Sequence, residues 1–315
     1  MSTFSRRRFV KTICAALAAA PIAPRLSRAA VASKEASAAG QGAEAAPFRL
    51  NYLLASSLYG SVHIRDVVPQ VRKAGCDALD VWWPNWVPHR TQVDEMGLDA
   101  FAALLKQHGA RLGATSPYKP GPFNLADELR AVAKLGGTLA ICGSTKPAKD
   151  VKQAMKDFIE RLKPQTAVAE EVGVDIGIEN HGNALLWQPD SFRHFCELAA
   201  SPRLKVSFAP YHLPQNPEEL GGLLKEIGPK LAHIYLWQRP TKEQKAADPL
   251  AELPGRGGMD FTPILAALKA IGFKGWSEIF THAHVHNGAM AATTDGVTQE
   301  VVTSRQYLES CLATL

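Results

Sequence analysis

Two glutamates lie where apolar runs of the sequence end. The run VDIGIENHGN, residues 174–183, passes from Val and Ile into Glu179 and His181, and GWSEIF, residues 275–280, contains Glu278. A strand buried on both faces accepts Val and Ile but not an unpaired carboxylate. These glutamates are therefore expected at the solvent end of a strand, or in a site that uses them. Two carboxylates with imidazoles nearby suit either divalent-metal binding or removal of a proton next to a carbonyl.

Histidine, tyrosine and tryptophan residues occupy similar positions near the ends of other apolar runs. Aromatic side chains there could stack on the apolar faces of a sugar ring or simply close the mouth of the fold. Each residue alone is commonly a structural group, and the convergence of several is what indicates a site. The candidates are His212, His233, Tyr235, Trp83 and Trp237.

The elements that would position these residues begin at about residue 48. From there, short β-rich runs alternate with longer amphipathic runs. Strands are predicted at 50–55, 77–83, 111–116, 138–143, 174–179, 204–209, 231–237 and 275–280. Helices are predicted at 62–74, 98–109, 124–135, 148–172, 189–200, 216–227, 261–271 and 297–313.

Eight βα units favour a single (β/α)₈ TIM barrel over residues 47–315. An open doubly wound sheet is the alternative. It lacks support because no Gly-rich phosphate-binding turn follows the first predicted strand. In a barrel, the carboxyl ends of all eight strands meet at one mouth, where the chemistry is expected.

Four motifs resemble one known superfamily, the xylose isomerase-like sugar phosphate isomerases and epimerases, to which endonuclease IV also belongs. They are IENHG (178–182), YHL (211–213), PGRGGMDF (254–261) and GWSEIF (275–280). The resemblance implies one divalent cation of the Mn²⁺ or Mg²⁺ type, held by Glu, Asp, His and Glu from strands five to eight. The two glutamates would also form the acid/base pair, which makes Glu179 the first metal ligand and Glu278 the last.

The two middle ligand positions depart from that pattern. Where the superfamily has Asp-x-x-His after strand six, this chain has Ala209 three residues before His212. Where it has His-x-His-Leu on strand seven, the ligand position is Tyr235. Alanine cannot bind a metal, whereas the histidine that contacts substrate in relatives is kept. A standard metal site is therefore not expected.

Three routes remain open at this mouth. One is a rebuilt metal site that uses His212 or His233. The run THAHVH also offers histidines, although three solvated loop histidines are the favoured interpretation of it. Another is metal-free acid/base chemistry by Glu179 and Glu278, with Tyr235 or His212 polarising a carbonyl oxygen. The last is a barrel that binds sugar without catalysis. The histidines of the run are His282, His284 and His286.

The first residues read as an export signal. SRRRFVK (5–11) resembles a twin-arginine motif, and an apolar stretch and a small-x-small cleavage site follow it. Residues 1–32 are thus predicted to be a signal peptide, and 33–46 a flexible leader. The expected partner is the twin-arginine export machinery, and the expected location is the periplasm or the exterior.

Removing the signal changes the charge of the chain. Six of the 35 basic residues and none of the 30 acidic residues lie in 1–32, so the remainder has 29 basic against 30 acidic residues. A surface for nucleic acid is not supported by that balance. No later apolar run approaches the length of a membrane span, so stable membrane insertion is not expected.

The sequence therefore predicts an exported isomerase or epimerase, or a lyase, that moves a proton next to a carbonyl. Glu179 and Glu278 are the central pair, and the expected substrate is an unphosphorylated sugar, keto-sugar or cyclitol. His181, His212, Tyr235 and the tryptophans would bind it, and Arg256 could hold a hydroxyl or an anionic group. A non-catalytic carbohydrate-binding barrel is the alternative. An endonuclease IV-like phosphodiesterase is less favoured, because it needs a dense metal cluster and a basic face.

Overall fold

Residues 47–282 and 288–315 are described by a computed structural model. Residues Phe48–Leu315 form one compact unit. The predicted signal peptide and leader, residues 1–46, lie outside the described residues, as do His284 and His286.

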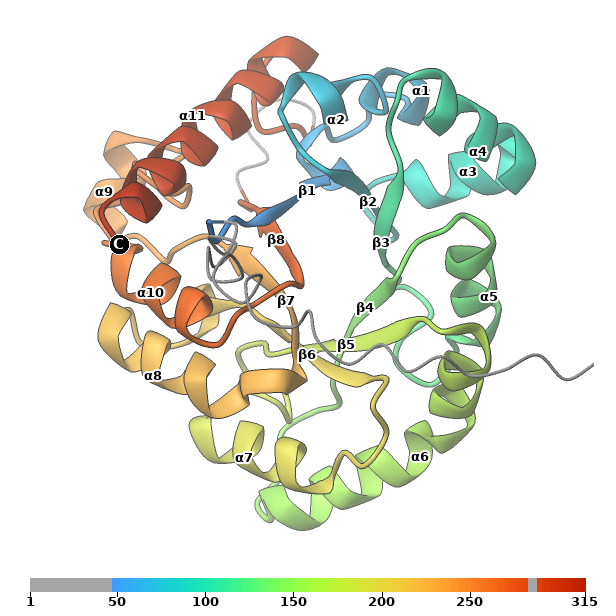
Figure 1. The fold of residues 1–315 in the computed structure, drawn as a ribbon, viewed down its shortest axis with the longest axis vertical. Helices are drawn as coiled ribbons and strands as arrows, with labels where there is room; N and C mark the ends of the chain where they lie inside the picture. Colours follow the sequence, from blue (N-terminus) through green and yellow to red (C-terminus); the bar gives the residue numbers. More distant parts are fainter. Residues whose placement is uncertain (1–46, 283–287) are drawn as a thin grey trace, which may run out of the picture. The chain divides into compact units, whose positions relative to one another are not determined.

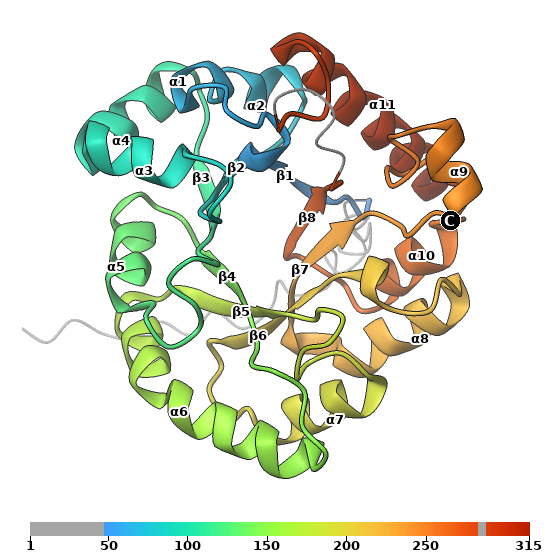
Figure 2. The same cartoon turned by 180° about the vertical axis from the view of Figure 1, so that it is seen from behind.

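Eight parallel strands close into a barrel in sequence order, and the helices surround it (Figure 1; Figure 2 gives the view from behind). The predicted (β/α)₈ barrel is confirmed, and each strand lies within one residue of its predicted bounds. The strands are β1 (Asn51–Ala55), β2 (Ala78–Trp82), β3 (Leu112–Ser116), β4 (Leu139–Gly143), β5 (Asp175–Glu179), β6 (Leu204–Phe208), β7 (Leu231–Leu236) and β8 (Trp276–Ile279).

The helices follow the predicted amphipathic runs with two kinds of difference. The run predicted as one helix at 62–74 is two short helices, because Pro69 removes a backbone donor between them. Two further helices, α3 and α9, were not predicted. The α-helices are α1 (Ile64–Val67), α2 (Gln70–Lys73), α3 (His89–Met96), α4 (Leu98–Gln107), α5 (Ala126–Lys134), α6 (Val151–Val172), α7 (Pro189–Leu198), α8 (Pro217–Ile227), α9 (Lys242–Ala247), α10 (Thr262–Ala270) and α11 (Thr294–Ala313).

Strand register places the candidate residues at the mouth side by side. Glu179 on β5 pairs with Ser207 on β6, and Ser207 pairs in turn with His233 on β7. Tyr235 on β7 pairs with Glu278 on β8. His233 and Tyr235 are two residues apart on β7, and side chains alternate between the two faces of a strand. Both side chains therefore lie on the same face and point into the barrel.

In the described part of the chain, no helix combines the length and apolar character that crossing a membrane requires.

Candidate active site

Glu179, at the carboxyl end of β5, is the carboxylate nearest the mouth. The residue is 8% exposed, and its Oε2 accepts a 2.7 Å hydrogen bond from the Tyr118 hydroxyl. Burial raises the pKa of Glu179 to about 7, while the Tyr118 bond and the charge of His181 act in the opposite direction. A carboxyl group that titrates near neutrality exchanges protons readily in both directions, as a general acid/base must.

The Tyr118 hydroxyl also contacts the hydroxyl of Tyr235 at 2.9 Å. When Tyr118 donates to Glu179, its oxygen accepts from Tyr235, which gives a chain of two hydroxyls that ends on the carboxylate. Burial raises the pKa of both tyrosines well above the ordinary value of 10, so both remain protonated donors. Tyr235 thus stands in the middle of the site as a hydrogen-bond donor.

Glu278 lies deeper than Glu179 and is fully buried. Its Oε1 accepts from the indole N–H of Trp82 at 3.1 Å, and its Oε2 lies 3.2 Å from His233 Nε2. Burial raises the pKa of Glu278 to about 8 and lowers that of His233 to about 3. Because burial disfavours both charged forms, their contact is a hydrogen bond between neutral groups at pH 7 rather than an ion pair.

Another buried carboxyl, Asp80 on β2, lies in the same interior network. Ser116 donates to its Oδ2 at 2.6 Å. Burial, and then the nearby charge of Glu278, raise the pKa of Asp80 well above its ordinary value. On the other side of the barrel, the Ser207 hydroxyl lies 2.6 Å from His233 Nδ1. Ser116, Ser207 and Glu278 thus bond to Asp80 and His233 inside the barrel, whereas Asp80 Oδ1 has no partner there.

His212 faces Glu179 across a gap. Its Nε2 lies 3.9 Å from Glu179 Oε1, too far for a hydrogen bond, and has no protein partner although it is buried. Trp187 fixes the loop by donating its indole N–H to the His212 carbonyl at 2.8 Å. Burial lowers the pKa of His212 to about 3, so its ring is neutral. The ring of His181 lies 4.0 Å from that of His212, centroid to centroid. A hydroxyl or a water placed to one side of both atoms could hydrogen-bond to His212 and Glu179 together.

Stacked aromatic rings form the wall around these groups. Trp237 stacks on Tyr211 at 4.0 Å, and Trp82 stacks on Phe280 at 4.7 Å. The ring of His282 packs edge-on against Trp237 at 4.5 Å. The indole N–H of Trp237 is buried without a hydrogen-bond partner, which leaves a donor for a ligand.

Two other predicted binding residues, Trp83 and Arg256, contact other parts of the protein. The ring of Trp83 faces the Arg90 guanidinium at 5.1 Å, and Trp82 rather than Trp83 contacts Tyr118. Arg256 forms ion pairs with Asp248 and Glu300. Its guanidinium is therefore already occupied by carboxylates of the protein.

Sequence reasoning missed Tyr118 and Asp80, and it favoured Trp83 over the neighbouring Trp82. Asp80 and Trp82 are inside a predicted strand, and their alternation with apolar neighbours was the available signal, because alternate residues of a barrel strand face inward. Tyr118 lies two residues beyond β3, at the same mouth as His181 and His212.

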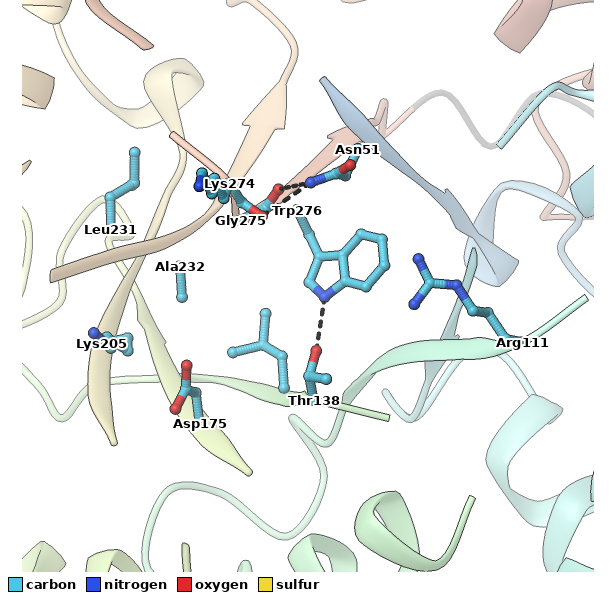
Figure 3. Close-up of a pocket in the computed structure, with 11 residues that line it drawn as sticks. Asn51, Arg111, Thr138, Asp175, Lys205, Leu231, Ala232, Lys274, Gly275 and Trp276 are labelled. Atoms are coloured by element: carbon cyan, nitrogen blue, oxygen red, sulfur yellow. Dashed lines mark hydrogen bonds between the residues drawn. The ribbon is translucent and has the colours of Figure 1, made fainter. Parts of the chain in front are cut away.

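A large cavity lies at the opposite end of the barrel, where the strands begin (Figure 3). It measures about 470 Å³, and the Trp276 indole projects into it. Trp276 donates to the Thr138 hydroxyl at 2.9 Å, and the Asn51 amide donates to the Lys274 carbonyl at 2.9 Å. Lys205 likewise donates to a backbone carbonyl at 2.9 Å.

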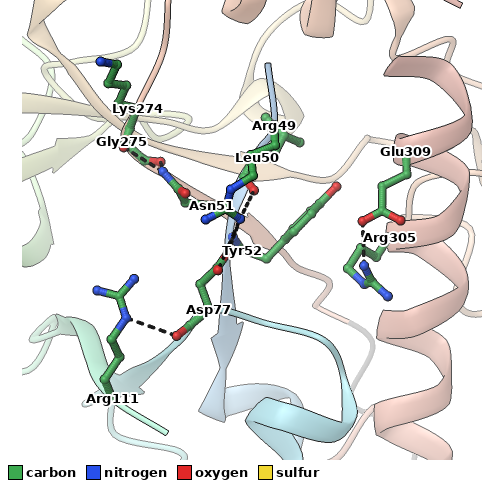
Figure 4. Close-up of polar contacts among 10 residues, drawn as sticks. All are labelled: Arg49, Leu50, Asn51, Tyr52, Asp77, Arg111, Lys274, Gly275, Arg305 and Glu309. Carbon is green, nitrogen blue, oxygen red and sulfur yellow. Dashed lines mark hydrogen bonds and ion pairs between the residues drawn. The ribbon is translucent and has the colours of Figure 1, made fainter. Parts of the chain in front are cut away.

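Neighbouring residues at this end hold one another in the same way (Figure 4). Asp77 accepts from Arg49 at 3.3 Å and from the Tyr52 backbone N–H at 2.8 Å, and its carbonyl accepts from Arg111 at 3.2 Å. These bonds tie the starts of β1, β2 and β3 together. Buried polar atoms without a protein partner occur at both ends of the barrel: His212 Nε2 and Trp237 Nε1 at the mouth, and the Tyr52 hydroxyl at the base. The mouth is the candidate site because the carboxyl ends of the strands, and Glu179 with them, meet there.

Residues 68–301 match the sequence profile of one protein family, described as the xylose isomerase-like TIM barrel. This chain belongs to that family. No curated protein matches the sequence.

Solved structures of the xylose isomerase-like fold superpose on most of the chain. A D-tagatose 3-epimerase-like protein is 17% identical, covers 84% of this chain and 98% of its own, and has a TM-score of 0.64. A D-psicose 3-epimerase from Clostridium cellulolyticum H10, solved with D-tagatose, is 17% identical with coverages of 84% and 99% and a TM-score of 0.65. A probable 3-DHS dehydratase from Bacillus anthracis is 11% identical with coverages of 82% and 99% and a TM-score of 0.65. At these identities the likeness establishes the fold alone.

The residues of the mouth do not fit the divalent cation that the resemblance implied. Ala209 has no ligand atom, and Tyr235 presents a hydroxyl that is bonded to Tyr118. Both oxygens of Glu278 already face hydrogen-bonding groups of the protein. Within residues 47–282 and 288–315, no three His, Cys, Asp or Glu side chains form a group that could hold a metal ion.

Proposed function

We propose that this protein is an isomerase or epimerase that moves a proton next to a carbonyl of a small sugar-like substrate. One observation carries the proposal. A carboxyl whose pKa burial raises to about 7 lies at the barrel mouth, hydrogen-bonded to Tyr118 at 2.7 Å and 3.9 Å from the unpartnered Nε2 of His212. Two structures that share the fold are described as ketose 3-epimerases or similar proteins, which supports the same reaction class.

The surroundings of Glu179 favour an uncharged substrate. Arg256 is paired with carboxylates, and Arg239 Nη2 donates to the Leu213 carbonyl at 3.2 Å. The remaining groups are tyrosine, neutral histidine and stacked aromatic rings. Such groups bind the hydroxyls and apolar faces of a sugar rather than a phosphate. We therefore propose an unphosphorylated keto-sugar or cyclitol ketone.

The depth of Glu278 bears on the type of reaction. Glu179 reaches the mouth, whereas Glu278 is fully buried with both oxygens engaged. Glu278 is then the second proton carrier only if the substrate displaces those contacts. Proton removal and return on one face by Glu179 gives isomerisation. Proton removal followed by loss of the hydroxyl on the next carbon, protonated to leave as water, gives elimination. Participation of both glutamates on opposite faces gives epimerisation.

Solvent deuterium exchange tests the proposal directly. Unphosphorylated ketohexoses and a keto-inositol are incubated with the protein in D₂O, and NMR follows loss of the proton next to the carbonyl. Wild type is expected to catalyse the exchange, and Glu179→Gln is expected to reduce its rate at least about 100-fold. Glu95→Gln, on the outside of α3, is the matched control. Binding of a ketose without exchange would instead support the non-catalytic carbohydrate-binding alternative.

We also propose that the protein is exported by the twin-arginine route, on the basis of SRRRFVK and the residues that follow it. Replacing Arg6 and Arg7 together by Lys is expected to keep the full-length chain in the cytoplasm, as seen by cell fractionation and immunoblotting. Export that continues in this variant would argue against the route.

A further inference from the structure

Enolisation needs two groups: a base for the proton on carbon, and a donor for the carbonyl oxygen, which gains negative charge. The base is Glu179 under the proposed function, on which this inference rests. A divalent cation often serves as the partner of the oxygen, but Ala209 and Tyr235 remove two of its ligand positions here. The second group must therefore come from the residues that surround Glu179.

Tyr118 is the hydroxyl closest to the base. Its OH lies 2.7 Å from Glu179 Oε2, and it is only partly buried, whereas Tyr235 is 1% exposed. A proton next to a carbonyl and the carbonyl oxygen lie on adjacent atoms of a substrate. Adjacent protein groups are accordingly needed to reach both, and Glu179 and Tyr118 meet this condition.

Tyr235 lies behind Tyr118 and changes what Tyr118 can do. The two hydroxyl oxygens are 2.9 Å apart, so Tyr235 can donate to the Tyr118 oxygen while Tyr118 donates elsewhere. A hydroxyl that accepts one hydrogen bond becomes a stronger donor of another. The ring of Trp82 packs against both tyrosines, with centroids at 5.3 Å and 6.0 Å, and holds the pair in place.

We propose that Tyr118 stabilises the enolate oxygen of the substrate, with Tyr235 as the positioning residue that strengthens its hydroxyl. On binding, the Tyr118 O–H turns from Glu179 to the carbonyl oxygen. Glu179 then takes the proton from the adjacent carbon, the C–H electron pair becomes the C=C bond, and the carbonyl π pair moves to oxygen. When Glu179 returns the proton to carbon, these electron movements are reversed and the carbonyl forms again. The step therefore consumes no oxidant, reductant or cation.

Tyr118→Phe removes the hydroxyl and keeps the ring against Trp82. In protein treated with a chelator, this variant is expected to exchange deuterium about 100- to 1,000-fold more slowly than wild type, with little change in KM. Tyr235→Phe is expected to lose about tenfold and to shift the pH profile of exchange. Tyr52→Phe, which removes a buried hydroxyl without a partner at the far end of the barrel, is the matched control.

A binding measurement separates this inference from the proposed function. A planar sugar hydroxamate mimics the enolate, whereas the corresponding alditol does not. Calorimetry is expected to show about tenfold weaker binding of the hydroxamate to Tyr118→Phe and equal binding of the alditol. Wild-type exchange that Tyr118→Phe leaves unchanged, or that chelation abolishes and Mn²⁺ restores, would overturn the role of Tyr118 alone. Tyr118-dependent hydroxamate binding without exchange on any ketose would overturn the proposed function and the enolate-stabilising role that rests on it, and would leave Tyr118 as a ligand-binding hydroxyl.

Discussion

Replacing Glu179 by Gln should remove a pH-dependent loss of stability from the protein. Burial raises the pKa of this carboxyl from 4.5 to about 7, which corresponds to about 3 kcal/mol. Between these pH values the unfolded chain has released the proton and the folded protein has kept it. The free energy of unfolding therefore falls as pH rises from about 4.5 through about 7. The glutamine side chain of the variant would not titrate, and its amide oxygen can still accept from Tyr118.

The difference between the two proteins isolates this residue. Buried His212 and His233, with pKa values lowered to about 3, act in the opposite direction below pH 6.5, because the unfolded chain protonates them first. Both proteins retain these histidines, so their effect cancels in the difference. Relative to Glu179→Gln, wild type is expected to lose about 3 kcal/mol of stability between pH 4.5 and pH 8.

Urea unfolding followed by tryptophan fluorescence at half-unit pH steps measures this difference. Glu95→Gln, which changes an exposed carboxyl on α3, should give the same profile as wild type. A difference profile that stays flat, or that rises with pH, would refute the argument that burial dominates the Glu179 pKa. It would also remove the reason for regarding Glu179 as a proton carrier at neutral pH.

Three further changes test other parts of the site. Ala209→Asp combined with Tyr235→His restores the two missing ligand types, and calorimetry should show Mn²⁺ binding that wild type lacks; equal binding by wild type would contradict the ligand assignment. Trp237→Phe keeps the stack on Tyr211 but removes the unpartnered N–H. KM in the exchange assay should then rise about tenfold with little change in kcat. An unchanged KM would show that this N–H does not bind the substrate. Arg256→Ala removes two partly exposed ion pairs and should cost at most about 1 kcal/mol in urea unfolding, with exchange rates intact; a large loss of exchange would return Arg256 to the site.

The barrel can be predicted from the sequence because the residues of each strand follow a strong local pattern. Runs such as VDIGIE are rich in β-branched residues, end in a polar residue and are followed by a helical pattern. Each βα unit can therefore be recognised from its local sequence. The short helices α3 and α9 could not be predicted in this way, because they are mainly polar and have no periodic apolar stripe. Pro69 marks the break between α1 and α2 in the sequence itself, because proline lacks the backbone donor that a continuous helix needs.

The site was less predictable because its contacts cross the barrel. Glu179 and His212 were found from their positions at strand ends, and the structure brings them to 3.9 Å of each other. The Tyr118–Tyr235 bond joins residues 117 positions apart, and nothing in either local sequence points to the other. Burial of Glu278 also depends on packing by Trp82, which no strand pattern reveals.

Asn180 ties the end of β5 to the residue after β6. Its side-chain amide accepts from the Ala209 N–H at 2.7 Å and donates to the Ala209 carbonyl at 3.0 Å. Both backbone groups of position 209 are thus fixed by a neighbouring strand, independently of the side chain that position 209 carries. A substitution at position 209 therefore leaves both backbone hydrogen bonds available, so the side chain there can change while Asn180 still links the two strand ends.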